Sequence, residues 1–73
     1  MNRTEKLLLL SQVYVGNLKG RFIVKQKTQK VTLIGEVREI SAKEVSINTY
    51  EGYRLIQVED FVSIQLLEEV TYE

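Results

Sequence analysis

The chain has 73 residues, contains neither cysteine nor histidine, and carries ten basic and ten acidic residues, so its net charge is zero. This length allows one domain with a small core, and the missing residue types exclude a disulfide framework and the usual structural zinc sites. Small domains that lack these aids are often stabilised by oligomerisation, so the composition favours self-association. The absence of cysteine also fits a reducing cytoplasm, which is the location we expect.

Residues 1–15 predict a short amphipathic helix and its lead-in rather than an export signal. The apolar run Leu7–Leu10 is too short for a signal sequence and is followed at once by polar residues. Asn2 or Thr4 is suited to cap the helix, and Glu5 would lie in its first turn, where the helix dipole favours a negative charge. The alternative is a strand at Val13–Val15 that leads into a turn.

Residues 20–67 predict a small antiparallel barrel of five strands, because apolar and polar residues alternate in successive runs separated by short polar breaks. The expected strands are residues 21–27, 31–40, 45–50, 53–58 and 62–66. Gly35 has no side chain to pack within the second run, which predicts a bulge or sharp bend there. We therefore expect a single, mainly β domain with one short N-terminal helix and a tail at residues 68–73.

Two segments resemble the sequence motifs of the Sm-like fold. Residues 33–40 (LIGEVREI) look like the first Sm motif, and residues 56–64 (IQVEDFVSI) look like the second. Within that superfamily, the chain is most similar to the YolD-like family of short bacterial proteins, whose second strand also has a glycine followed by alternating apolar residues. The resemblance covers residues 21–66. It implies an SH3/Sm-like barrel, pairing between subunits and a bacterial origin.

The chain departs from the RNA-binding Sm proteins in two loops. Those proteins have an aspartate followed by a methionine-asparagine type step after the second strand, and an arginine-glycine type step before the fifth. This chain has SAKE at residues 41–44 and VED at residues 58–60 instead. Neither loop supplies a stacking ring or a guanidinium group, and Glu59 and Asp60 would repel phosphate. The departures argue against RNA binding at these loops.

The charges are divided between the two halves of the chain. Residues 1–38 have a net charge of +6 and residues 39–73 a net charge of −6. Opposite charges could pair across neighbouring strands, where each pair contributes about 0.2–1 kcal/mol. Alternatively, the charges form separate basic and acidic faces, which would suit head-to-tail association or an acidic partner. The basic face would consist of Lys19, Arg21, Lys25, Lys27 and Lys30.

Tyrosine and arginine side chains near the fourth strand are the candidate contacts for a protein partner. These residue types are favoured at interfaces, where they supply large contact area and a polar end. Ordinary cross-strand packing of the two tyrosines is the alternative. The interaction candidates are Tyr50, Tyr53, Arg54 and Phe61.

The sequence therefore predicts a non-catalytic β-barrel module for protein–protein interaction or self-assembly in a bacterial cell. Its means of association would be the open edges of the fourth and fifth strands. The alternative is an Sm-like single-stranded RNA-binding protein that uses the basic face, although Phe22 is the only aromatic residue interleaved with it. We expect no catalytic residue, no cofactor, no metal and no membrane-spanning segment.

Overall fold

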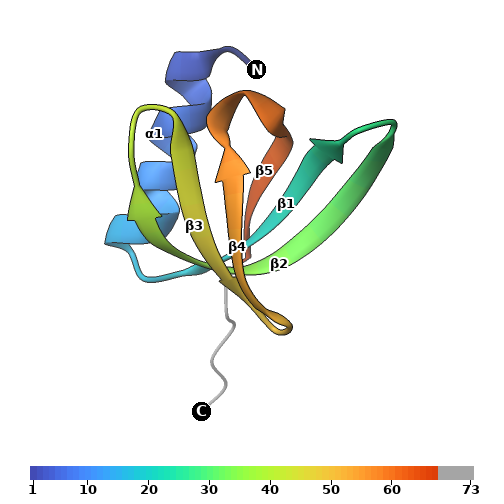
Figure 1. Cartoon of the computed structure of the whole chain (residues 1–73). Helices are drawn as coiled ribbons and strands as arrows, with labels where there is room; N and C mark the ends of the chain where they lie inside the picture. Colours follow the sequence, from blue (N-terminus) through green and yellow to red (C-terminus); the bar gives the residue numbers. More distant parts are fainter. Residues whose placement is uncertain (68–73) are drawn as a thin grey trace.

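A computed structural model describes residues 1–67, in which one helix packs against a single curved antiparallel sheet (Figure 1). Five strands lie in the spatial order β4-β3-β2-β1-β5, which confirms the mainly β, barrel-like fold. The elements in chain order are α1 (Arg3–Val15), β1 (Lys19–Gln26), β2 (Gln29–Ile40), β3 (Glu44–Thr49), β4 (Gly52–Gln57), the 3-10 turn η1 (Val58–Asp60) and β5 (Phe61–Leu67). The tail predicted at residues 68–73 lies outside the described residues.

Helix α1 begins after Asn2, whose side-chain oxygen accepts a hydrogen bond from the backbone amide of Glu5 at 2.8 Å. Such a cap satisfies one of the amide groups that the first turn of a helix leaves without a partner. Asn2 rather than Thr4 is therefore the cap. The helical prediction is confirmed, and the alternative strand at Val13–Val15 is wrong.

The inner face of the sheet and one side of α1 enclose a single core. The rings of Phe22 and Phe61 meet edge to face with their centroids 5.8 Å apart, an arrangement worth about 0.5–1.5 kcal/mol beyond the area buried. Phe61 is only 2% exposed. It is therefore part of the core, and its prediction as an interaction residue is wrong. The buried residues are Leu10, Val13, Phe22, Val24, Leu33, Val37, Val45, Ile47, Ile56, Val58, Phe61 and Ile64.

Gly35 lies at a close approach of β2 to β3. A Cβ atom added to this glycine would collide with the backbone carbonyl of Asn48 on β3. The pairing register runs through Gly35 without a shift, and the irregularity in the β2–β3 ladder comes later, between Val37 and Glu39. The bulge expected at Gly35 therefore lies further along the strand, and the glycine is needed for backbone proximity.

Two basic side chains at the start of α1 form hydrogen bonds with backbone carbonyl groups outside the helix. The guanidinium group of Arg3 donates a hydrogen bond to the carbonyl oxygen of Ala42 in the β2–β3 turn. The Nζ atom of Lys6 donates to the carbonyl oxygen of Glu59 in η1 at 3.1 Å. The helix thus connects two loops that are far apart in sequence, on the side of the sheet seen behind β3 in Figure 1.

Candidate interaction surfaces

Strands β4 and β5 are the two edges of the sheet, and within residues 1–67 each pairs with one neighbour only. The sequence of β5, FVSIQLL, contains neither a charged residue nor a proline. Edge strands are usually protected by charge, proline, bulges or shortness, since their free amide and carbonyl groups can pair with another chain. The only charged residue of β4 is Arg54, which forms an ion pair with Glu51 at 3.4 Å. The β5 edge has one irregularity, at Val62, where the ladder with β1 shifts its register. Apart from it, both edges are suited to receive a further strand.

Large apolar side chains are exposed on these same edge strands. Tyr53 and Leu55 on β4 are 69% and 65% exposed, and Val62 on β5 is 41% exposed. Tyr53 and Leu55 lie opposite Asn48 and Ser46 of β3, so they project from the outer side of the sheet, away from the core. A strand added at either edge would cover part of this apolar surface.

The structure brings three of the predicted interaction residues together at the β3–β4 turn. Tyr50 lies in the turn and is fully exposed, whereas Tyr53 and Arg54 lie on β4. The two tyrosines are not cross-strand partners, because Tyr53 lies opposite Asn48. The alternative of cross-strand tyrosine packing is therefore wrong.

Sequence reasoning missed Leu55 and Val62 as exposed apolar residues. The signal for Leu55 was its alternation with the inward-facing Ile56, which places neighbouring residues on opposite faces. Strict alternation over the expected strand 62–66 would place Val62 on the same face as Ile64, but Phe61 and Ile64 are the buried residues of β5. A register shift of the β1–β5 ladder between Ile23 and Val24 leaves Val62 outside the regular pairing.

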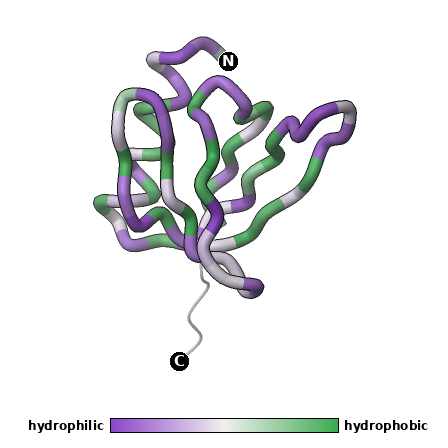
Figure 2. Tube along the Cα trace, in the orientation of Figure 1, coloured by the Kyte–Doolittle hydropathy of each residue, from purple (hydrophilic) through white to green (hydrophobic). Residues whose placement is uncertain are grey.

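Three exposed lysines gather at the end of the β1–β2 hairpin, and we call Lys25, Lys27 and Lys30 the lysine tip. Lys25 and Lys30 are direct cross-strand partners, an arrangement in which like charges destabilise the pairing. Lys27 occupies the turn with a positive φ of 55°. The hairpin extends away from the rest of the fold, and its end is hydrophilic (Figures 1 and 2).

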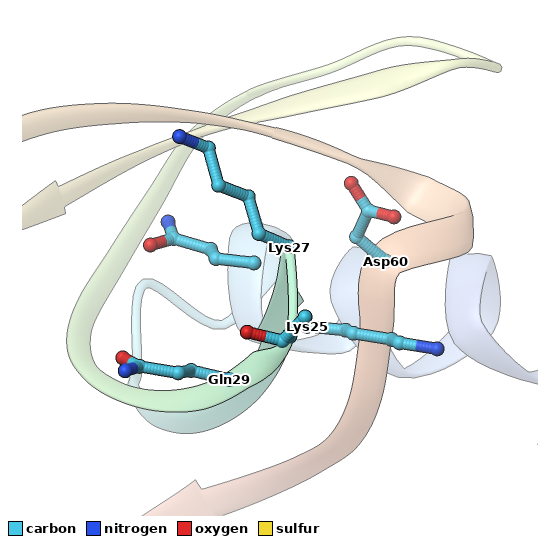
Figure 3. Close-up of a pocket in the computed structure, with 6 residues that line it drawn as sticks. Lys25, Lys27, Gln29 and Asp60 are labelled. Atoms are coloured by element: carbon cyan, nitrogen blue, oxygen red, sulfur yellow. The ribbon is translucent and has the colours of Figure 1, made fainter.

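A hollow of about 800 Å³ lies between the lysine tip and η1. The close-up in Figure 3 shows Lys25 and Lys27 extending from the hairpin, with Asp60 facing the same space from η1. Within residues 1–67, no lysine of the tip forms an ion pair, with Asp60 or with any other carboxylate. The hollow is therefore predominantly basic. Its lining residues are Lys25, Gln26, Lys27, Thr28, Gln29 and Asp60.

The five residues of the predicted basic face do not form one cluster. Lys19 and Arg21 belong to the opposite end of β1 from the lysine tip, where they lie across from Leu67 and Gln65 of β5. The interleaved aromatic residue, Phe22, is completely buried. The basic surface thus lacks an exposed ring from this strand on which a base could stack.

An acidic groove of about 200 Å³ lies on β2, β3 and β4, near the β2–β3 turn. The Ser41 hydroxyl organises this turn, because it accepts a hydrogen bond from the amide of Glu44 at 3.0 Å and donates one to its carbonyl at 3.0 Å. The side chain of Gln57 donates to the Glu44 carboxylate at 3.3 Å. The acidic groove is lined by Glu39, Ile40, Ser41, Glu44, Ser46 and Leu55.

Opposite charges do not pair between strands in the described part of the chain. The two ion pairs there are local: Arg38 with Glu36 at 3.7 Å within β2, and Arg54 with Glu51 at 3.4 Å at the β3–β4 turn. The prediction of cross-strand charge pairing is therefore wrong. The lysine tip lies at the start of β2 and the acidic groove at its end, where Arg38 on the strand and Lys43 in the following turn are basic neighbours of the groove.

No helix within residues 1–67 is long and apolar enough to cross a membrane. Across the same residues, no three acidic side chains are grouped in a way that could hold a metal ion. Neither a protein-family model nor a curated protein sequence matches this chain. The similarity to Sm-like and YolD-like proteins stays a prediction.

Proposed function

We propose that this chain is a non-catalytic interaction module that self-associates by pairing its two free sheet edges, and that it acts in a bacterial cytoplasm. The observation that carries the proposal is that the two edge strands combine free backbone groups with exposed apolar side chains and little protection by charge. The edge strand β5 has no charged residue or proline to protect it, and the other edge strand, β4, exposes Tyr53 and Leu55. Addition of a strand satisfies the free backbone groups and buries such side chains at the same time.

The size of the domain supports the same proposal. A chain of 73 residues buries a smaller share of its surface than a larger domain does, so it gains more from an intermolecular contact. The two edges also differ in sequence, and a contact between unlike surfaces is head to tail. We therefore expect β4 of one copy to pair with β5 of the next.

Two lysine substitutions test this pairing, because a charge on the edge strand opposes addition of a further strand. Tyr53→Lys should block the β4 edge and Val62→Lys the β5 edge, and each variant alone should be monomeric by sedimentation velocity. An equimolar mixture should form a heterodimer, since each variant keeps one functional edge. Dimers of Val62→Lys alone would instead indicate pairing between two β4 edges.

Ile34→Lys is the matched control for these variants. Ile34 is 47% exposed, but it lies on β2, which has strand neighbours on both sides. The control should retain the association of the native chain. Equal loss of association in all three variants would contradict edge pairing, because the effect would then depend on surface charge rather than on the edge.

Single-stranded RNA binding by the basic residues is the second candidate. The clustering of Lys25, Lys27 and Lys30 favours it, since a basic cluster attracts phosphate. The burial of Phe22 removes the one stacking residue that lies among these positions. Binding of an oligouridylate probe that weakens steeply with salt would support this candidate.

A further inference from the structure

We propose that the lysine tip of one copy docks into the acidic groove of a second copy, which sets the direction of self-association. The inference rests on the proposed function in taking a second copy of this chain as the partner. It adds a charged contact, separate from edge pairing, between the β1–β2 hairpin and the region of the β2–β3 turn.

The lysine tip concentrates positive charge that the fold does not neutralise. Lys25 and Lys30 face each other across the ladder, and within residues 1–67 neither they nor Lys27 form an ion pair. Asp60 is the single acidic residue that lines the adjoining hollow. A carboxylate supplied by a partner would offset the like-charge repulsion at this end of the hairpin.

The acidic groove has the chemistry that a lysine side chain requires. Glu39 and Glu44 supply two carboxylates, and Ile40 and Leu55 supply apolar surface in the same groove. Lysine commonly lays its methylene stem along apolar side chains while its ammonium group contacts an acid or water. Leu55 is 65% exposed, so its surface is open to such a stem.

The two surfaces do not meet within one copy, because no ion pair in residues 1–67 joins a lysine of the tip to Glu39 or Glu44. The lysine tip is at the start of β2 and the acidic groove is at its end, and the strand has 12 residues. A contact between them is therefore intermolecular. Because the surfaces differ, it joins copies head to tail, as pairing of β4 with β5 also would.

A charge-exchange experiment tests this contact. The tip variant Lys25→Glu/Lys27→Glu and the groove variant Glu39→Lys/Glu44→Lys should each weaken association by about tenfold or more at 50 mM salt. An equimolar mixture should recover the native strength, because the acidic tip of the first variant matches the basic groove of the second, and the unaltered tip and groove also match. Sedimentation equilibrium measures the association, and circular dichroism confirms the fold.

Lys19→Glu is the matched control, since Lys19 is an exposed basic residue at the far end of β1. It should change association much less than the tip variant does. Should the Glu44 substitution disturb the β2–β3 turn, Glu39→Lys alone serves as the groove variant. Unchanged association of the tip variant, or a mixture no stronger than its components, would overturn the inference. So would loss of oligouridylate binding by the tip variant with native self-association, because the lysine tip would then be an RNA site.

Association measured at low and at high salt distinguishes the charged contact from edge pairing. At about 1 M salt the Debye length falls to roughly 3 Å, so a charged contact at the surface is largely screened. The tip variant should then associate as the native chain does, whereas Val62→Lys should stay defective at both salt concentrations. A tip variant that is equally defective at both would contradict the charged contact but leave edge pairing standing. Native association by Val62→Lys at high salt would contradict edge pairing alone.

Discussion

The middle and the start of β2 belong to one strand, but different constraints determine their sequences. In the middle, Leu33 and Val37 are buried, and Gly35 lies against the backbone of β3. At the start, Gln29 and Lys30 are exposed and pair only with β1 in a projecting hairpin. Packing explains the residues of the middle. It does not explain Lys30 at the start, which faces Lys25; under our proposal this lysine pair contacts a second copy.

Gly35→Val, in the middle of β2, is the substitution that we expect to lower the free energy of unfolding most. Its Cβ atom would collide with backbone rather than with a side chain that can move. We expect destabilisation above about 4 kcal/mol, at the extreme of what single substitutions cause, and therefore loss of the folded state. Urea unfolding followed by circular dichroism measures the effect. Thr32→Val, at an exposed position of the same strand, is the control, and a native midpoint for Gly35→Val would refute the close approach.

Phe22→Ala tests the core that the middle of β2 helps to enclose. The ring is completely buried and forms the edge-to-face contact with Phe61. Removal of a buried phenylalanine side chain costs about 3–5 kcal/mol, and the free energy of unfolding in urea should fall by that amount. A loss below 1 kcal/mol on the same scale would mean that the ring is not packed as described.

Asn2→Ala tests how much the N-terminal cap stabilises α1, the helix that covers this core. Loss of the hydrogen bond to the amide of Glu5 should reduce the free energy of unfolding by about 0.5–2 kcal/mol. Thr4→Ala is the matched control and should leave stability nearly unchanged, because Thr4 lies inside the helix. An equal loss in both variants would assign the effect to the first turn in general rather than to the cap.

Lys25→Thr should have the smallest effect on stability. Unlike the substitutions above, it should stabilise the fold, because the lysine pair at the start of β2 does not serve packing. Removal of one member of the Lys25–Lys30 pair should stabilise the fold by about 0.2–1 kcal/mol at low salt, while self-association becomes weaker. Thermal unfolding at low and high salt and sedimentation equilibrium together measure both effects. Lys19→Thr, which removes a lysine that faces Leu67, should not stabilise the fold. A lower melting temperature for Lys25→Thr at low salt would contradict the proposal that the Lys25–Lys30 pair is kept for interaction at a cost in stability.

Alternation of apolar and polar residues was sufficient to predict all five strands, because side chains on successive strand residues face opposite sides. The helix was predicted from its capping residue and from Glu5 in the first turn. Alternation was not sufficient near η1. There the chain makes a 3-10 turn, and Phe61 enters the core while Val62 faces outward. A periodic pattern cannot locate such a change of phase, so Phe61 was mistaken for a contact residue.

The charge pairing was not predictable from the sequence either, because it depends on which strands become neighbours. The basic strand β1 lies between the lysine-bearing start of β2 and the uncharged β5. The carboxylates of Glu39 and Glu44 lie instead around the far end of β2. The placement of these charges was therefore not predictable, whereas the open edges at the fourth and fifth strands were predicted from the sequence and are confirmed by the strand order.

The most direct test of edge pairing is sedimentation velocity of the native chain and Val62→Lys over a range of concentrations at about 1 M salt, where surface charge contacts are screened. Our account predicts a concentration-dependent oligomer for the native chain and a monomer for the variant. A native chain that sediments as a monomer at every concentration, or a variant that assembles like the native chain, would contradict the proposal that the edges hold copies together.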